Sequence, residues 1–303
     1  MPTINIKAHL YPSPVRPDRP RAAYEYQFPS PSSPKHSNAL IFLPGLGDAP
    51  FEVPYVQTLA RHLAATNSSY SVFEINLSSA GSAFGYSSLA DDVRDVAALV
   101  RYLKDKEGRE RVVVMGHSTG CQDCLEYASR TGGDVMEVDG YVLQGPVSDR
   151  EAIGLGVGEG ELKGGLEVAE GLVKSGKGGE VLSRGLLPEE WRGSPVTAYR
   201  WWSLAGVGGD DDYFSSDLSD EKLASIWNAV QKPVLILPSG ADEFVPAAVD
   251  VPGMVEKWKG FCRPGMASDL SGLIPGANHR ADDAQAQEWL ADRVARFLEG
   301  LEK

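Results

Sequence analysis

A serine in a glycine-flanked pentapeptide is the residue of this chain best suited to nucleophilic chemistry. Ser118 is the central residue of Gly116-His117-Ser118-Thr119-Gly120, which fits the pattern G-x-S-x-G. The apolar run Arg111 to Met115 precedes this pentapeptide, and a helix-like stretch that begins at Cys121 follows it. A strand that turns sharply into a helix exposes a strained serine, and the two glycines relieve the crowding around it. The context therefore predicts that Ser118 is a nucleophile.

A serine hydroxyl is a weak nucleophile and needs a histidine base. His279 lies in a loop after the last strand-like stretch and before the final helix, where chains with this serine motif carry their base. The other four histidines occur before or beside the serine, and we expect His117 to point away from Ser118. His9 is predicted on an edge strand, His36 in a loop, His62 on a helix face and His117 in the turn beside the serine. We therefore predict that His279 is the base.

The histidine in turn needs a carboxylate that fixes its tautomer. Asp242 lies just after the strand-like run Pro233 to Leu237, so the chain order is Ser, Asp, His. Glu243 is the nearest competitor, and Asp149 is a more distant one. In the alternative without catalysis, Asp242 only caps the next helix.

Ester hydrolysis also needs donors for the oxyanion, and backbone amides serve this purpose well. One predicted donor is the amide of Thr119, at the start of the helix after the nucleophile. The other is the amide of Leu46, in the glycine-rich turn Leu43 to Asp48 that follows an apolar strand. This turn lacks the Gly-Lys-Ser/Thr ending of a phosphate-binding loop.

Strand-like and helix-like segments alternate along most of the chain. This rhythm predicts an α/β fold with a mostly parallel central sheet and helices on both faces. An N-terminal strand pair is predicted around Ala22 to Phe28, between proline-rich and serine-rich connections at Pro12 to Pro20 and Pro29 to Ser37. The buried strands are predicted at 39–43, 71–77, 111–115, 140–144 and 233–237, and the helices at 53–65, 87–106, 121–130, 220–230, 247–259 and 282–301.

Residues 151–232 interrupt the alternation, and we interpret them as a cap inserted into a core of residues 1–150 and 233–303. The segment contains the glycine-rich run 154–179, and its formal charge is −6, from fourteen acidic and eight basic residues. Aromatic side chains above a catalytic sheet can enclose a ligand, or they can form the core of the cap itself. The tryptophans of this segment are Trp191, Trp201, Trp202 and Trp227. As candidate substrate contacts we select Trp201, Trp202, Asp211, Asp212 and Tyr213.

Composition excludes several classes of function. The chain has 303 residues with 29 basic and 42 acidic side chains, so attraction to nucleic acid or to an anionic membrane surface is not expected. Only three cysteines are present, Met1 to Pro20 lacks the apolar core of a signal peptide, and no apolar run approaches the roughly 20 residues needed to cross a bilayer. We therefore expect a cytoplasmic protein.

Three further patterns do not indicate a cofactor or a metal. Cys121 and Cys124 have redox-like spacing, but they fall in the helix after the nucleophile and are interpreted as buried structural thiols. The run Gly154 to Gly160 resembles a dinucleotide loop, but Glu159 replaces a required glycine. No histidine and carboxylate cluster has zinc-like spacing. The sequence thus predicts neither a cofactor nor a metal site.

The chain resembles the α/β-hydrolase superfamily and, more narrowly, the fungal siderophore esterases that open fusarinine-type iron chelates. The resemblance is carried by LPGLGD at 43–48, NLSSAGSAFGYSSL at 76–89, GHSTGCQD at 116–123, LQGPVSDRE at 143–151, TAYRWWSL at 197–204, DDYFSSDL at 211–218 and SGADEFVP at 239–246. It implies an α/β-hydrolase fold and an intracellular esterase whose small-molecule substrate is an ester of a hydroxamate siderophore complex, with iron as cargo. It leaves the exact chelate and the oligomeric state open.

Two other functions remain compatible with the sequence. The same three residues serve a carboxylesterase, a thioesterase or a lipase, although an acidic, glycine-rich cap is unlike the broad apolar lid of a lipase. A protein of another class, a ligand-binding protein without catalysis, can retain the hydrolase shape; labelling of Ser118 by a fluorophosphonate distinguishes it from an enzyme.

Overall fold

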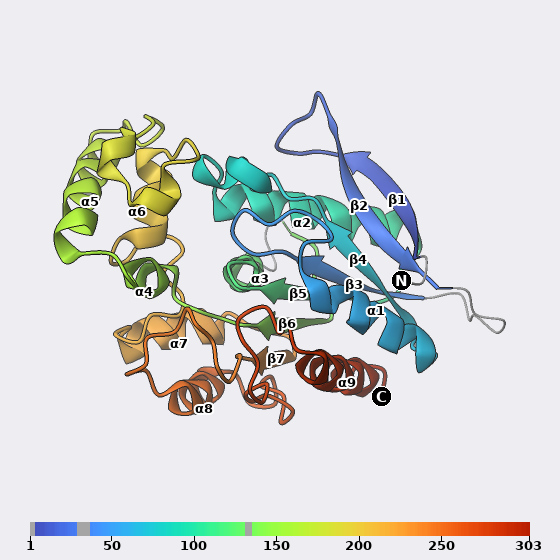
Figure 1. The fold of residues 1–303 in the computed structure, drawn as a ribbon. Coiled ribbons are helices and arrows are strands. Elements are labelled where there is room, and N and C mark those ends of the chain that lie inside the picture. The colour runs from blue at the N-terminus through green and yellow to red at the C-terminus, as the bar shows by residue number, and fades with distance from the viewer. Residues whose placement is uncertain (1–3, 29–36, 131–134) are drawn as a thin grey trace.

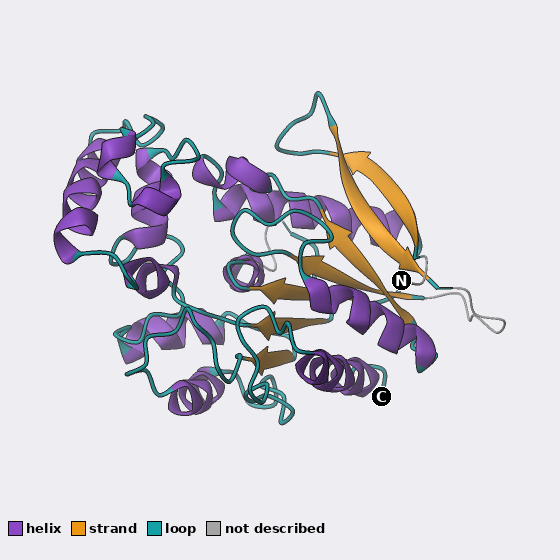
Figure 2. Cartoon of the chain, in the orientation of Figure 1, coloured by secondary structure: helices purple, strands orange, loops and turns teal. Residues whose placement is uncertain are grey.

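The computed structural model describes residues 4–28, 37–130 and 135–303. Residues 29–36 lie outside these ranges. They comprise all but the last residue of the predicted connection Pro29 to Ser37, and they include His36. Within the described ranges a seven-stranded sheet has the order β1-β2-β4-β3-β5-β6-β7 (Figures 1 and 2). The strands are β1 (Asn5–Pro12), β2 (Pro20–Gln27), β3 (Asn38–Leu43), β4 (Tyr70–Ile75), β5 (Val112–His117), β6 (Gly140–Gln144) and β7 (Val234–Leu237).

The strand directions follow the expectation from the sequence. β1 pairs with β2 and β2 with β4 in antiparallel fashion, whereas β4, β3, β5, β6 and β7 are parallel. The predicted N-terminal strand pair and the mostly parallel core sheet are therefore confirmed. Because parallel strands end at one edge of the sheet, the turns after β3, β5, β6 and β7 come close together there.

Helices cover both faces of the sheet because the core strands are apolar on both sides. Along β3, Ile41 packs into the cluster below α2 and α3, whereas its neighbours Leu40 and Phe42 pack into the cluster below α1 and α9. The core helices are α1 (Pro54–Ala65), α2 (Leu89–Asp105), α3 (Gly120–Ser129), α7 (Asp220–Asn228), α8 (Val251–Phe261) and α9 (Ala284–Gly300).

Three helices lie beside the edge at which the arrows of β5, β6 and β7 end (Figure 2). They are α4 (Asp149–Gly154), α5 (Glu159–Lys174) and α6 (Ala198–Ala205), with short helical turns η1 (Gly81–Gly85), η2 (Arg184–Leu186) and η3 (Glu189–Trp191). The sequence predicted no helix in the glycine-rich run, yet α5 spans most of it. Glycine lowers helix propensity, but Gly165 is needed here because a Cβ would lie 2.1 Å from the carbonyl oxygen of Leu186.

The apolar side chains of the segment predicted as a cap divide between two clusters. Trp201 on α6 packs with Ala169 on α5, with Leu187 between these helices and with other residues in a separate cluster. Trp227 on α7 instead packs with Phe214 and Trp258 in the core cluster. That residues 151–232 form a single cap stays a prediction. The elements from α4 to α6 are the part of this segment that has a hydrophobic cluster of its own. In the described part of the chain, no helix combines the length and the apolar character needed to span a membrane.

Candidate active site

Ser118 sits at a sharp turn between β5 and α3, with a left-handed backbone φ of 53°. Its amide donates to the carbonyl oxygen of Gln144 at 3.0 Å, which ties the turn to β6. The flanking glycines are required by space, because a Cβ on Gly116 would lie 2.1 Å from the carbonyl oxygen of Gly120. A non-glycine residue in this backbone region is strained, and such strain is typical of a serine held out from a strand-to-helix turn.

His279 is held from three sides in the loop before α9. Its amide donates to Glu243 Oε2 at 2.8 Å, and its carbonyl oxygen accepts from Gln144 Nε2 at 3.2 Å. The ring of Phe244 meets its imidazole edge-on, with 4.8 Å between the ring centroids. Only 4% of His279 is exposed. The imidazole is therefore fixed before any substrate arrives.

The structure brings Asp242 and His279 together. Asp242 Oδ2 lies 2.8 Å from His279 Nδ1, and Asp242 Oδ1 accepts from the amide of Phe244 at 3.0 Å. A carboxylate accepts the Nδ1 proton, so Nε2 remains as the basic nitrogen. The two competing carboxyl groups have other partners: Glu243 binds the backbone of His279, and Asp149 accepts from Gln122.

Ser118 and His279 line one pocket, which encloses about 1020 Å³ of empty volume, part of it open to solvent. Within the described residues no hydrogen bond joins the Ser118 hydroxyl to His279. Such catalytic contacts often tighten only in the complex with substrate. The structure thus brings the residues predicted as base and orienting acid together and places the base candidate in one pocket with Ser118. Their catalytic roles stay a prediction.

The two amides predicted for the oxyanion border the same pocket. Leu46 lines it, and Gly45 packs so closely that a Cβ there would lie 3.1 Å from Ser118 Cβ. Thr119 is the N-cap residue of α3. Neither the Leu46 amide nor the Thr119 amide donates a hydrogen bond to any residue that the structure describes. Their role as oxyanion donors stays a prediction.

His117 is placed differently from the sequence expectation. It lines the pocket together with Ser118, and its ring centroid lies 4.9 Å from that of His279. Gln144 explains this placement: its Nε2 donates to Ser239 Oγ at 3.1 Å, which leaves its Oε1 to accept from His117 Nδ1. Burial, helped by the nearby His279, lowers the pKa of His117 to about 3, so its imidazole is neutral at physiological pH.

Gln144 is a site residue that the sequence analysis missed. It bonds His117, Ser239 and the carbonyl of His279, and so joins the ends of β5 and β7 to the loop of the base. One signal was present in the sequence: Gln144 is a lone polar residue at the end of an apolar strand. Which groups it bonds depends on neighbours that are distant along the chain.

Charged side chains also border the pocket. Arg280 Nη1 contacts both carboxylate oxygens of Asp48, at 3.0 and 3.2 Å. Glu190 is exposed and lines the pocket from η3, next to Trp191. The Asp48 and Arg280 charges offset each other, so Glu190 and Asp149 are the pocket's remaining acidic groups.

The five residues selected as substrate contacts do not line this pocket. Trp201 is fully buried in the cluster of α5 and α6, and Trp202 packs against that cluster from a separate groove beside α5. The polar residues are engaged elsewhere: Asp211 bonds Arg200, Asp212 faces Arg150, and Tyr213 Oη donates to Glu126. A buried carboxylate requires a partner inside the protein, which takes Asp211 and Asp212 away from a ligand.

The cysteines after the nucleophile are buried free thiols, as predicted. Burial raises the pKa of Cys121 and of Cys124 well above the ordinary value for a thiol. They are therefore poor nucleophiles and poor ligands. Among the described residues, no group of three or more histidine, cysteine, aspartate or glutamate side chains is arranged to hold a metal ion.

Comparison with known proteins gives consistent results. A family model described as "Protein of unknown function (DUF1749)" matches residues 8–299. The "Fusarinine C esterase sidJ" of Aspergillus fumigatus is 29% identical, over 88% of this chain and 90% of that protein. The "Esterase AN6793" of Emericella nidulans is 30% identical, over 92% of this chain and 90% of that protein.

Solved structures confirm the fold. The structure titled "Siderophore hydrolase EstB from Aspergillus fumigatus" is 27% identical and covers all of both chains with a TM-score of 0.81. More distant α/β-hydrolases share the fold at 16% identity, one with a TM-score of 0.69. The predicted α/β-hydrolase fold is therefore correct.

Proposed function

Because this chain belongs to the DUF1749 family and is similar to esterases of fungi, we propose that it is a serine esterase that hydrolyses ester bonds of fusarinine-type hydroxamate siderophores. The observation that carries this proposal is the contact between Asp242 and His279, because this histidine lines one pocket with the strained Ser118. The substrate class is supported by relatives named as a fusarinine C esterase and a siderophore hydrolase.

In this mechanism His279 Nε2 takes the proton of Ser118 as the serine oxygen attacks the ester carbonyl carbon. The amides of Leu46 and Thr119 stabilise the oxyanion, and Asp242 stabilises the imidazolium. His279 then returns the proton to the leaving alkoxide, so an alcohol departs and an acyl-enzyme remains. A water molecule, deprotonated by His279, releases the acid and restores the Ser118 hydroxyl. The neutral His117 adds no positive charge beside the transient imidazolium.

Ester cleavage would release iron without a redox step. A siderophore binds ferric iron tightly because its ester linkages hold several hydroxamates at high effective concentration. Each cut ester removes part of this preorganisation and lowers the affinity for the ion. Iron is then cargo of the substrate, and the proposal assigns no metal to the protein.

We also propose that α4 to α6 act as the cap of this site and that the protein works in the cytoplasm. Residues of α4 and η3 line the pocket, which supports the first point. The three free cysteines are compatible with a reducing compartment. Cell fractionation with an antibody against the chain tests the location.

The decisive test incubates the purified protein with ferric fusarinine C, its triacetylated form and short p-nitrophenyl esters, with products resolved by mass. We expect linear hydroxamate fragments from at least one chelate and no turnover by the Ser118→Ala variant. Turnover of the p-nitrophenyl esters alone would make the chain a general carboxylesterase. Absence of turnover and of fluorophosphonate labelling at Ser118 would make it a binding protein.

A further inference from the structure

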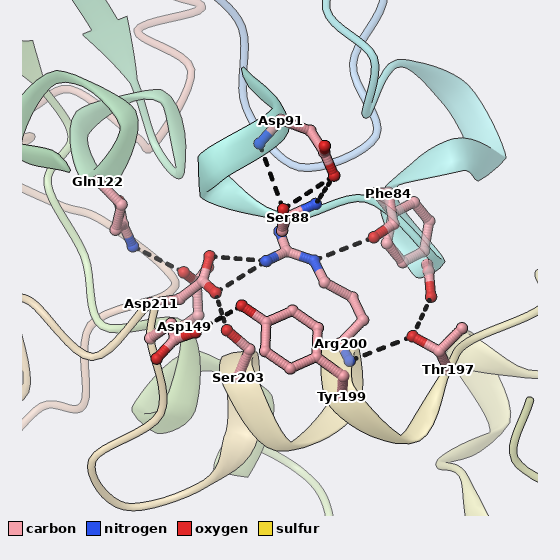
Figure 3. Close-up of polar contacts among 12 residues, drawn as sticks. Phe84, Ser88, Asp91, Gln122, Asp149, Thr197, Tyr199, Arg200, Ser203 and Asp211 are labelled. Atoms are coloured by element: carbon pink, nitrogen blue, oxygen red, sulfur yellow. Dashed lines mark hydrogen bonds and ion pairs between the residues drawn. The ribbon is translucent and has the colours of Figure 1, made fainter. Parts of the chain in front are cut away.

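A buried carboxyl group that is not part of the Ser118, His279 and Asp242 set reaches the same pocket. Asp149 is the first residue of α4, directly after the turn that follows β6. It lines the pocket with Ser118 and His279, although only 8% of the residue is exposed. Its Oδ2 accepts a hydrogen bond from Gln122 Nε2 on α3 at 2.6 Å (Figure 3). Asp149 is thus fixed between the core and the ligand space.

The cations near Asp149 are already matched by other carboxylates. Arg200 Nη1 on α6 contacts both oxygens of Asp211, at 2.9 and 2.8 Å, and Arg200 is only 2% exposed (Figure 3). Arg150, the neighbour of Asp149 on α4, faces Asp212 with an N···O distance of 3.4 Å. Among the residues that the structure describes, no cation forms an ion pair with Asp149 itself.

Further acidic groups face this region from the other packed elements. Asp123 comes from α3 and Asp92 from α2, and both are buried. Glu151, two residues further along α4, is bonded to Ser216. Burial raises the pKa of Asp149 well above its ordinary value, and the charge of Asp211 raises it further, against the opposing effect of Arg200. Burial among these acidic groups therefore favours the neutral, protonated form of Asp149.

The contacts also indicate which oxygen carries the proton. Gln122 Nε2 donates both to Asp149 Oδ2 and to the carbonyl oxygen of Val147, at 2.6 and 3.2 Å, so Oδ2 acts as an acceptor. Asp149 Oδ1 bonds no described residue, and it is not among the fully enclosed unpartnered atoms. The acid proton therefore belongs on Oδ1, the oxygen that is neither bonded to a described residue nor fully enclosed.

We propose that Asp149 is a specificity-determining residue that, as a neutral carboxylic acid, donates a hydrogen bond from Oδ1 to an oxygen atom of the substrate away from the scissile ester. This inference rests on the proposed function and specifies its substrate contact. A neutral donor selects a carbonyl or a hydroxamate oxygen, whereas it offers no charge to an ammonium group. A buried donor also discriminates strongly, because a substrate without the acceptor leaves the donor unpaired.

The test compares Asp149→Asn with Asp149→Ala, each checked for thermal unfolding. Asparagine is neutral and of equal size, and its amide can accept from Gln122 through oxygen while its NH₂ group donates to the pocket. We expect Asp149→Asn to keep kcat/KM for ferric fusarinine C within about threefold and Asp149→Ala to lower it about tenfold or more. For p-nitrophenyl acetate, which has no carbonyl or hydroxamate oxygen besides its ester, both variants should remain within about threefold of the unaltered enzyme.

The pH profile gives an independent readout. In the unaltered enzyme, kcat/KM for the chelate should fall on the alkaline side as Asp149 loses its proton, and this fall should be absent from Asp149→Asn. Equal losses in both variants would show that a negative charge is what matters and would overturn the inference. So would full activity of Asp149→Ala, or an Asp149→Ala loss of the same size on p-nitrophenyl acetate.

A failure of the proposed function can be separated from a failure of this inference. If the unaltered enzyme hydrolyses p-nitrophenyl esters but not ferric fusarinine C, the proposed substrate is wrong. The role of Asp149 is then decided by p-nitrophenyl pentanoate and p-nitrophenyl 4-oxopentanoate, which differ by one carbonyl oxygen. Selective loss of the keto ester in Asp149→Ala supports the inference, and equal kinetics for the two esters overturns it.

Discussion

Asp242 Oδ2 lies 2.8 Å from His279 Nδ1, and the two side chains are only 2% and 5% exposed. Glu243, the next residue, bonds the backbone amide of the same histidine. Two adjacent carboxylates thus hold one histidine in different ways. Only the bond from Asp242 can fix the tautomer of the ring, because it involves a ring nitrogen.

This difference predicts unequal effects of two conservative changes. Asp242→Asn should lower kcat by about 10³ to 10⁴-fold, because an amide can favour the wrong tautomer and cannot stabilise the imidazolium. Glu243→Gln should lower it less than about tenfold, since a glutamine oxygen still accepts from the His279 amide. Steady-state kinetics with a p-nitrophenyl ester measures both. Similar losses in the two variants would remove Asp242 from its proposed role.

The turn at Ser118 predicts a steric effect on stability. In Gly116→Ala the new methyl group would lie 2.1 Å from a backbone oxygen, so the turn must distort. We expect the free energy of unfolding to fall by about 3 kcal/mol or more, measured by urea denaturation. Gly164→Ala is the matched control on α5, where a Cβ meets no atom within 4 Å, and it should raise stability by up to about 1 kcal/mol. An unchanged midpoint for Gly116→Ala would contradict the close packing described.

A buried glutamate on β2, which contacts β1, β4 and the segment after α2, predicts how stability depends on pH. Glu25 Oε2 lies 3.1 Å from His9 Nε2, and Glu25 Oε1 accepts from Ser71 Oγ at 2.7 Å and pairs with Arg109. Burial opposes ionisation, but these hydrogen bonds and the Arg109 charge lower the pKa of Glu25 from 4.5 to about 2. A shift of this size corresponds to about 3 kcal/mol.

Because the folded-state pKa is depressed, this stabilisation is present above pH 4.5 and is lost as the pH falls toward 2. Glu25→Gln should therefore be less stable than the unaltered protein by about 3 kcal/mol at pH 7. The difference should shrink steadily below pH 4.5. Urea midpoints at several pH values measure it, and a difference that stays constant with pH would refute the assignment.

The buried pair of Arg200 and Asp211 predicts a large cost when one partner is removed. Arg200 also donates from Nε to the carbonyl oxygen of Phe84 in η1 at 3.0 Å, so it joins α6 to the core. Arg200→Met leaves Asp211 buried without its cation and should lower the free energy of unfolding by about 3 to 5 kcal/mol. Adding Asp211→Asn should recover part of this loss.

An exposed ion pair provides the control for that experiment. Lys174 and Glu170 on α5 are 2.7 Å apart, but their side chains are 70% and 49% exposed. Lys174→Met should change stability by less than about 1 kcal/mol, because exposed pairs are screened by water and salt. If Arg200→Met costs no more than Lys174→Met in urea denaturation, the Arg200 pair does not hold α6 to the core.

Much of the core was predictable because its signals are local. The apolar strands followed by turns, and the amphipathic stretches between them, predicted the five parallel strands described and the core helices to within a few residues. The pentapeptide around Ser118 and the chain order of Asp242 and His279 were enough to select these residues as candidates. Helix α5 was missed because its glycines lower the local helix propensity. One of them, Gly165, is needed for close packing against the backbone of Leu186, which a local pattern does not reveal.

What the sequence determined by itself was the α/β-hydrolase architecture and the choice of candidate nucleophile, base and acid, since both depend on residue types and their order. What only the tertiary structure decided was which buried polar groups meet. Asp211 and Asp212, predicted to contact substrate, are engaged by Arg200 and Arg150, whereas Asp149 reaches the pocket. The physical reason is that a buried charge takes its partner from whatever the fold places beside it, and those partners are distant along the chain.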